Sequence, residues 1–173
     1  YAKVQLFHKW RDNNVAQQWQ FKHLGNNEYQ IISKLSNKAI SADINKVQNG
    51  EQLFLLPAVS NSCSQKWKAI QNGAGFVFKN SCNPIYVMDV NAARAVDENR
   101  VQLWGRWGNN NKAQAWIIEK TNTNKETQLI QDGIYSITTA LNNGQFLDVA
   151  KGNTENYAKV QLFHKWRDNN VAQ

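Results

Sequence analysis

The chain has 173 residues, 42% apolar and 19% charged, a length that suits one well-packed domain and is short for two. Its formal net charge is +7, but residues 1–17 occur twice, each copy carrying two Lys, one Arg and one Asp, so the domain counted once is +5. The cations are scattered, which favours a solvated surface over a nucleic-acid site, and no apolar run approaches the length of a membrane-spanning helix.

Short segments rich in β-formers, separated by Asn- and Gly-rich turns, predict an all-β chain. In chain order, the predicted strands are 3–10, 17–22, 28–34, 38–43, 51–57, 65–70, 75–79, 85–90, 101–107, 114–120, 133–139 and 145–149. Residues 121–131, TNTNKETQLIQ, are typical of a linker.

A threefold repeat organises these strands. Three Gln-x-Trp motifs recur at steps of 48 and 49 residues: Gln17-Gln18-Trp19, Gln65-Lys66-Trp67 and Gln114-Ala115-Trp116. A Gln-Leu-aromatic motif precedes each one: Gln5-Leu6-Phe7, Gln52-Leu53-Phe54 and Gln102-Leu103-Trp104. Three sets of four strands about a pseudo-threefold axis would close and cap a barrel, which is a β-trefoil. Each motif Trp is expected in the core, with its Gln bonded to the backbone of the adjoining turn.

A second repetition has another origin. Residues 1–17 recur without a change as 157–173, a shift of about one whole trefoil. A single domain spanning 1–173 then has two copies of this segment but only one position for it. A circular permutant or a slice of an identical tandem array would have this arrangement. Engineering is the preferred explanation of the repetition. We expect the other copy to hang free or to enter a neighbouring molecule, giving a homo-oligomer by strand exchange.

Two units have the groups that sugar recognition requires, namely an aromatic plate, a carboxylate and side-chain amides. In the first unit these are Asp148, Gln161, Phe163, Trp166 and Asn170, with the duplicates Gln5, Phe7, Trp10 and Asn14. At equal offsets, the last unit has Asp89, Gln102, Trp104, Trp107 and Asn111. Because Leu separates Gln from the aromatic residue, strand alternation predicts Leu inside, and Gln with Phe163 (or Phe7) or Trp104 outside.

Less specific interpretations of these residues stay open. The two Asp residues could cap turns, and Trp10, Trp166 and Trp107 could be rim packing instead of sugar contacts. In the middle unit Ser41 stands at the Asp position and the following loop is two residues shorter, so no useful sugar binding is expected there.

The segment Phe146-Leu147-Asp148-Val149, the following Val-Gln-Leu-Phe and the Gln-x-Trp motifs resemble the repeat of the ricin B-chain and xylanase-linked β-trefoil lectins, including lectin modules of bacterial toxins. The resemblance covers nearly the whole chain outside the linker. It implies a secreted, non-catalytic lectin for terminal galactose-type glycans on glycoproteins or glycolipids, with no cofactor, no metal and no membrane insertion. It also assigns sugar contacts to Asp148 with Phe163 (or Phe7) and to Asp89 with Trp104, although Ala16 and Ala113 stand where the family usually has Asn.

Other functions have weaker support. His8, His164 and His23 do not accompany a Ser, a Cys or a paired acid, and no zinc-ligand spacing or phosphate loop is present. A polysaccharide-anchoring module of a glycoside hydrolase, a trefoil acting through heparin or protein contacts, and an engineered strand-exchanging trefoil remain as alternatives. Cys63 and Cys82 could form one disulfide or remain two thiols.

Overall fold

The computed structural model describes residues 3–9, 14–120, 130, 132–141, 145–149, 154, 156, 160 and 161 of the chain. Within these residues lie thirteen β-strands and four short 3-10 helices, and no α-helix. The predicted all-β class is therefore confirmed. No helix in this part of the chain is long and apolar enough to cross a membrane.

Twelve of the strands form three units of four. The first unit consists of β11 (Gly133–Thr139), β12 (Gln145–Val149), β1 (Gln5–His8) and β2 (Trp19–Gly25). The middle unit consists of β3 (Glu28–Ser33), β4 (Lys38–Ser41), β5 (Phe54–Pro57) and β6 (Trp67–Asn72). The last unit consists of β7 (Gly75–Asn80), β8 (Tyr86–Val90), β9 (Val101–Gly105) and β10 (Trp116–Lys120). Each predicted strand contains one of these strands or overlaps it.

Short 3-10 helices adjoin the strands. One precedes the fourth strand of each unit: η1 (Val15–Gln17), η2 (Cys63–Gln65) and η4 (Lys112–Gln114). A further turn, η3 (Asn91–Ala93), follows β8. The Gln of each Gln-x-Trp motif thus ends a helical turn, and the strand begins only at the Trp, two residues later than predicted.

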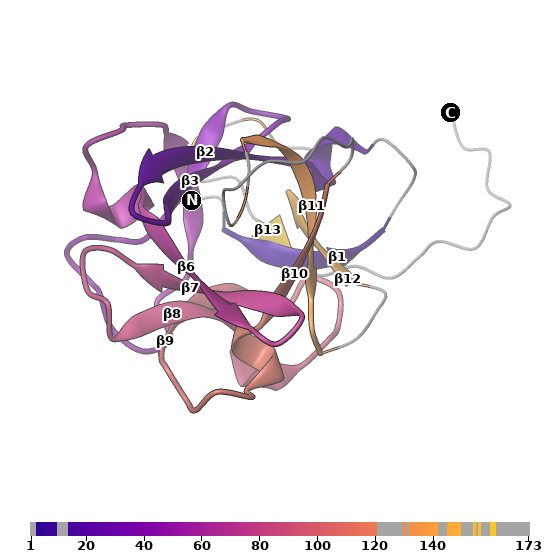
Figure 1. Ribbon diagram of the computed structural model, residues 1–173. Helices are drawn as coiled ribbons and strands as arrows, with labels where there is room; N and C mark the ends of the chain where they lie inside the picture. The colour runs from indigo at the N-terminus through magenta and orange to yellow at the C-terminus, as the bar shows by residue number, and fades with distance from the viewer. Residues whose placement is uncertain are drawn as a thin grey trace, which may run out of the picture.

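The first and fourth strands of the units form a closed six-stranded barrel (Figure 1). Pairing within the units joins β11 to β2, β3 to β6 and β7 to β10. Pairing between units joins β2 to β3, β6 to β7 and β10 to β11. The second and third strands of the units form the antiparallel pairs β12–β1, β4–β5 and β8–β9, of which the last two are hairpins. Closure removes the free edges of the barrel, so the predicted β-trefoil is confirmed.

A ring of backbone hydrogen bonds defines the pseudo-threefold axis where the hairpins meet. The Val4 N–H donates to Leu53 O, the Leu53 N–H to Val101 O (3.0 Å), and the Val101 N–H to Val4 O (2.8 Å). The Gln52 side-chain amide donates to all three of these carbonyl oxygens. The ring shows which residues of the three units are equivalent.

This equivalence corrects two predictions. Ser41 pairs with Phe54, as Asp89 pairs with Gln102 and Asp148 with Gln5. The middle counterpart of the Gln-Leu-aromatic motif is therefore Phe54-Leu55-Leu56, and the predicted Gln52-Leu53-Phe54 is wrong by two residues. The prediction of a loop two residues shorter after Ser41 is wrong for the same reason, because Ser41 and Phe54 are 13 residues apart, as Asp89 and Gln102 are. The physical reason is the axial ring, because Leu53 must supply the backbone N–H and carbonyl that Val4 and Val101 supply in the other units.

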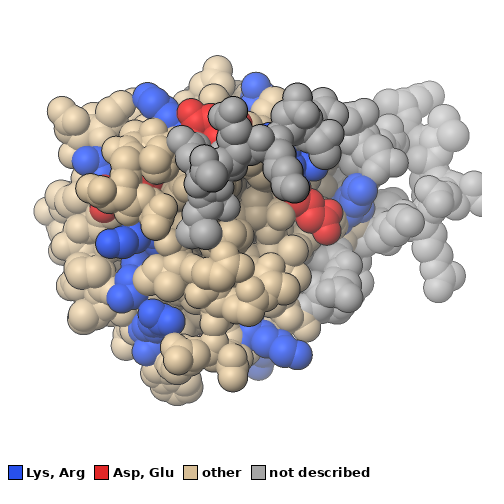
Figure 2. Space-filling model, viewed as in Figure 1, with Lys and Arg blue, Asp and Glu red and all other residues tan. Residues whose placement is uncertain are grey.

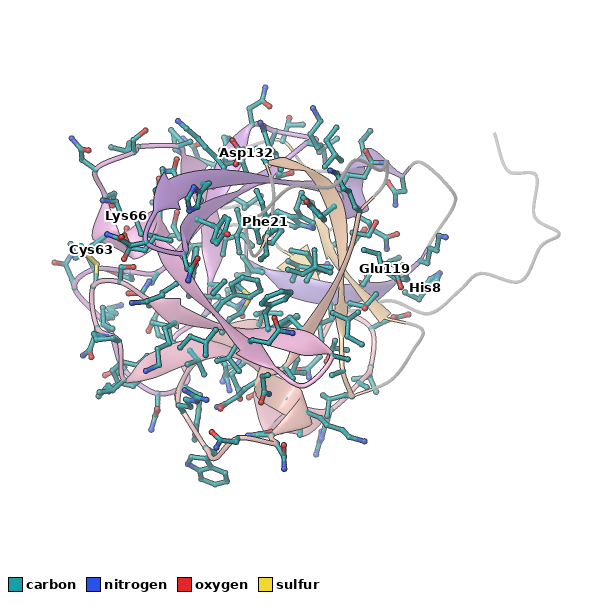
Figure 3. All side chains as sticks on the ribbon, in the orientation of Figure 1. His8, Phe21, Cys63, Lys66, Glu119 and Asp132 are labelled. Atoms are coloured by element: carbon teal, nitrogen blue, oxygen red, sulfur yellow. A yellow bond between two sulfur atoms is a disulfide. The ribbon has the colours of Figure 1, made fainter. Side chains whose placement is uncertain are left out.

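The motif tryptophans fill the core as predicted. Trp19, Trp67 and Trp116 are fully buried, and their indole N–H groups donate to Leu147 O, Ile40 O and Met88 O, each at 3.1 Å. Each Trp thereby joins its strand to the second strand of its own unit while burying a large apolar surface. Phe21, labelled in Figure 3, is also fully buried and packs against the rings of Tyr29, Phe78 and Tyr135. Truncating one such Trp to Ala would cost about 3–5 kcal/mol.

The two cysteines form a disulfide. Cys63 in η2 and Cys82 after β7 are joined with a Cα–Cα distance of 4.8 Å, and Cys63 lies at the edge of the molecule (Figure 3). The bond closes a loop that includes β6 and β7, so it fastens the middle unit to the last one.

Two sequence predictions concern residues near the ends of the domain. Ile130 lies within the predicted linker 121–131; it is buried in the core, and its N–H donates to the Tyr29 hydroxyl (3.1 Å). The rest of 121–131 lies outside the described residues. Of the duplicated segment, the N-terminal copy supplies β1, and the C-terminal copy supplies β13 (Val160–Gln161), which also pairs with β12.

Candidate functional site

The last unit forms an open pocket of about 620 Å³. It lies between the end of β8, η3, β9 and the loop that leads to η4. Its walls consist of Asp89, Val90, Asn91, Ala92, Ala93, Gln102, Trp104, Trp107, Asn111 and Ala113. All five residues predicted for the last unit are in this set, so the structure brings them together.

The β8–β9 hairpin sets the direction of these side chains. Asp89 pairs with Gln102, and Val87 with Trp104. Leu103 between them is fully buried in the core, as predicted, and Trp104 on the opposite face is partly exposed. Gln102 is the exception, because it was predicted to be outside and is buried.

Asp89 is held by two side-chain amides, which explains the burial of Gln102. Gln102 Nε2 donates to Asp89 Oδ1 (3.0 Å) and Gln114 Nε2 to Asp89 Oδ2 (3.2 Å). The carboxyl is only 6% exposed, and burial raises its pKa to about 6 against the opposing effect of the two amides. Each carboxylate oxygen keeps a second lone pair with which it can accept a hydrogen bond from a ligand.

Gln114 is a positioning residue of the site, although the sequence predicted only that it would bond to the backbone of the adjoining turn. Besides holding Asp89, its Nε2 donates to Gly105 O (2.9 Å), and its Oε1 accepts from the Trp107 N–H (2.9 Å). One side chain thus fixes the acid and the backbone of the aromatic loop. The signal was available in the sequence, because the spacing from Asp89 to Gln114 equals the spacing from Asp148 to Gln173.

Asn111 and Trp107 form the outer part of the pocket. Asn111 Oδ1 accepts from the Ala113 N–H (3.0 Å), which caps η4 and fixes the direction of its NH2 group. The side chain of Trp107 is 69% exposed. Rim packing alone would have covered more of it, so this indole is available to a ligand.

Five wall residues were not predicted as site residues, namely Val90, Asn91, Ala92, Ala93 and Ala113. Ala92 and Ala93 both have φ of 53°, a left-handed conformation that costs energy in residues other than glycine. Asn99 Nδ2 holds the turn by donating to Asn91 O (2.8 Å) and Arg94 O (2.7 Å). The run of small residues directly after Asp89 was the only signal in the sequence.

The first unit has the same framework, and its described acid, amide and aromatic residues are all buried. Asp148 pairs with Gln5 and is 3% exposed, while Gln5 is fully buried. Phe7 is 5% exposed and its ring stacks on that of His8 at 4.9 Å, so the prediction that Phe7 is exposed is wrong. His8 Nδ1 lies 3.5 Å from Asp97 Oδ2, which places the β8–β9 connection against this end of β1.

The remaining residues predicted for the first unit are only partly described. Asn14 caps η1 by accepting from the Ala16 N–H (3.0 Å), as Asn111 caps η4. Gln161 is described as a strand residue opposite Asp148. Trp10, Phe163, Trp166 and Asn170 lie outside the described residues.

The carboxyl groups of the first unit differ from Asp89 in their surroundings. Burial, with a smaller effect of the Asp97 charge, raises the pKa of Asp148 to about 8 against a hydrogen bond from Gln17. Burial and the Glu98 charge raise the pKa of Asp97 to about 7. Asp148 Oδ2 and both amide atoms of Gln5 are buried without a hydrogen-bond partner, whereas the equivalent Asp89 and Gln102 bond to each other.

The middle unit lacks the acid. Ser41 Oγ donates to Ala39 O (3.0 Å) and accepts from Gln65 Nε2 (3.1 Å). Leu56 takes the position of Trp104. The motif Gln is thus bonded to the residue at the Asp position here as well, but no carboxylate faces outward, and the prediction that this unit does not bind sugar stands as a prediction.

The comparisons with known proteins agree with this geometry. A family model described as a ricin-type beta-trefoil lectin domain-like domain matches residues 15–104. The chain belongs to this family. No curated protein matches the sequence.

Solved structures show the same fold as this ricin-type lectin-like chain. The designed threefold-symmetric protein ThreeFoil superposes with a TM-score of 0.65 and 18% identity, over 88% of this chain and 92% of its own. A mosquitocidal holotoxin superposes with a TM-score of 0.60 and 17% identity, over 87% of this chain and 16% of its own. The C-half of an earthworm R-type lectin in complex with GalNAc gives 0.52 and 16%, over 87% of this chain and 91% of its own. The chain therefore spans a small part of the toxin and nearly the whole of the other two.

The ricin-type lectin-like family is generally non-catalytic. In the residues that the structure describes, no three His, Cys, Asp or Glu side chains are placed to hold a metal ion. The carboxyl of the candidate site is bonded to amides, which neither take up nor release protons at neutral pH.

Proposed function

We propose that the chain is a non-catalytic lectin domain whose last unit binds a terminal galactose-type sugar. The observation that carries the proposal is the convergence of Asp89, Gln102, Trp104, Trp107 and Asn111 on one open pocket. In a ricin-type lectin-like chain, these are the three kinds of group that a saccharide needs: a carboxylate, amides and flat rings.

The mode of binding follows from the chemistry of the pocket. The Trp104 indole packs against the C–H face of the sugar ring, where it removes apolar surface from water. Asp89 accepts from two vicinal hydroxyls, and the Asn111 amide donates to a ring or hydroxyl oxygen. An open pocket of this kind buries little surface, so we expect a dissociation constant of about 0.1–1 mM for a monosaccharide.

The ligand class is supported by the earthworm R-type lectin, whose structure contains GalNAc. We infer that this chain acts by adhesion or delivery, holding an attached partner at a glycan-bearing surface. The fold it shares with part of a mosquitocidal holotoxin is consistent with that role. The Cys63–Cys82 disulfide supports a secreted or extracellular location, because such bonds persist in oxidising compartments.

The test is a glycan array on the unmodified chain, followed by calorimetry with the best galactoside. We expect one bound sugar per chain, loss of binding in Asp89→Asn, and near-normal binding in the matched variant Asp148→Asn, because Trp104 of the last unit is exposed to the pocket whereas Phe7, the described aromatic residue of the first unit, is buried. A variant Asp89→Asn that binds like the unmodified chain would overturn the site.

The same array separates the alternative functions. Retention on xylan without recognition of galactosides would indicate a polysaccharide-anchoring module. Recognition of heparin that disappears at high salt would indicate an electrostatic contact elsewhere on the surface.

A further inference from the structure

Strand β12 pairs with both copies of the duplicated segment in one register. Asp148 lies opposite Gln5 of β1 and opposite Gln161 of β13, and Val149 lies opposite Val160. Gln161 is the counterpart of Gln5 in the repeated segment. The two copies therefore pair with β12 in the same register, and Asp148 takes part in both pairings.

The position that β1 holds beside β12 places several requirements on the strand that fills it. Leu6 and Val4 are fully buried, the Leu6 N–H donates to Asn99 O (3.0 Å), and Val4 contributes one third of the axial ring. A strand in this position completes the core and the threefold axis at once. Any strand that fits must carry small or branched apolar side chains at both places.

The second copy meets these requirements as well as the first. Residues 157–173 have the same side chains in the same order as 1–17, so Val160 and Leu162 correspond to Val4 and Leu6. The two copies differ only in their covalent connection. The first continues directly into β2 through Gln18, and the second follows β12 along the chain.

We propose that either copy can occupy the position that β1 holds beside β12, and that the other copy is a donor strand for this position in a second copy of this chain. Addition of an extended segment to a sheet in this way is a known mode of recognition. Within one chain the tether gives each copy an effective concentration in the millimolar range, so the chain closes on itself first. Exchange between chains occurs when neither copy within a chain can fill this position.

Three variants of the full chain test the first part of this proposal. Leu6→Asp disables the first copy, Leu162→Asp disables the second, and the double variant disables both, because a buried carboxylate cannot be accommodated in the core. We expect both single variants to unfold cooperatively within a few degrees of the unmodified chain, and the double variant to lose its thermal transition. If Leu6→Asp is as unstable as the double variant while Leu162→Asp is silent, only the first copy can serve and the proposal fails.

Mixing tests the second part. The double variant is combined with the unmodified chain, and in a parallel sample with the free peptide YAKVQLFHKWRDNNVAQ at about 1 mM. We expect recovery of the double variant's thermal transition in both samples, and a complex of two chains by size-exclusion chromatography with light scattering in the first. The same peptide with Asp in place of its Leu is the control. A double variant that stays unfolded with both partners overturns strand donation.

Discussion

At the scale of single residues, the candidate site depends on how Asp89 is held. Two amides fix the direction of its carboxyl, and burial lifts its pKa to about 6. A sugar hydroxyl must donate to the ionised form, so protonation of Asp89 competes with binding.

This competition predicts a pH dependence of affinity. Below the pKa of Asp89 the proton must leave before the sugar binds, so affinity at pH 5 is expected to be about tenfold weaker than at pH 7. Titration calorimetry across this range measures the effect. A dissociation constant that does not change between these pH values would show that Asp89 is not the acceptor.

Stability should respond to pH in the opposite direction. The pKa values of Asp89, Asp97 and Asp148 are raised above the ordinary value to about 6, 7 and 8, so the folded chain holds protons that the unfolded chain has released. Their contribution is fully present below about pH 4 and is lost as the pH rises through these folded-state values. Chemical denaturation should therefore give a free energy of unfolding that falls between pH 4 and 8, with a smaller fall in Asp148→Asn.

The two pocket tryptophans should differ from the core tryptophans in what they stabilise. Trp104→Ala removes the stacking plate and is expected to weaken sugar binding about tenfold or more. Because Trp104 is partly exposed and Trp107 largely so, neither substitution should lower the melting temperature as Trp116→Ala would. Calorimetry and thermal denaturation of the three variants give both quantities. Loss of stability without loss of binding in Trp104→Ala would show that this ring is structural.

At the scale of elements, the hairpins and their 3-10 turns determine which unit is open. In the last unit, η3 follows β8 and contains two alanines in the left-handed conformation. These alanines form part of the wall of the open pocket that Asp89 also lines. The acid and its Gln partner are buried in both units, but Phe7 of the first unit is 5% exposed whereas Trp104 of the last unit is partly exposed. The same framework therefore gives different access in the two units.

The disulfide links η2 to the segment after β7, and neither of its cysteines lines the pocket. Paired substitution of Cys63 and Cys82 by Ser is expected to lower the free energy of unfolding by about 3 kcal/mol. Sugar affinity measured well below the melting temperature should stay within twofold, since neither cysteine lines the pocket. Affinity that fell along with stability would indicate that the β7–β8 connection positions the site.

At the scale of the whole molecule, the charge is positive but dispersed. Lys and Arg side chains are spread over the face shown in Figure 2 with Asp and Glu among them. The pocket walls include four polar residues, two tryptophans and no cation. Recognition of a neutral sugar by such walls does not depend on long-range attraction.

We therefore expect binding to a neutral galactoside to change less than twofold between about 0.05 M and 0.5 M salt. Calorimetry at the two concentrations tests this, with heparin as a comparison ligand whose binding would weaken. Sugar affinity that falls steeply with salt would indicate that the surface cations make the dominant contact.

The sequence alone determined the architecture and much of the last unit's site. The period of the Gln-x-Trp motifs required three units, because a single four-stranded set cannot bury its apolar face. The equal spacing of the site residues in the first and last units predicted that Asp89, Gln102 and Trp104 lie together, as they do in the pocket. Local spacing carries this information because strand alternation and hairpin pairing act over a few residues.

Only the tertiary structure decided the register of the middle unit, the burial of Phe7 in the first unit and the bond between the cysteines. The middle register is set by the axial ring of Val4, Leu53 and Val101, which come from three hairpins. The burial of Phe7 depends on groups from other units, including the β8–β9 connection that meets His8. Contacts between segments far apart in the chain leave no periodic trace in the sequence, so they are determined only when the whole barrel closes.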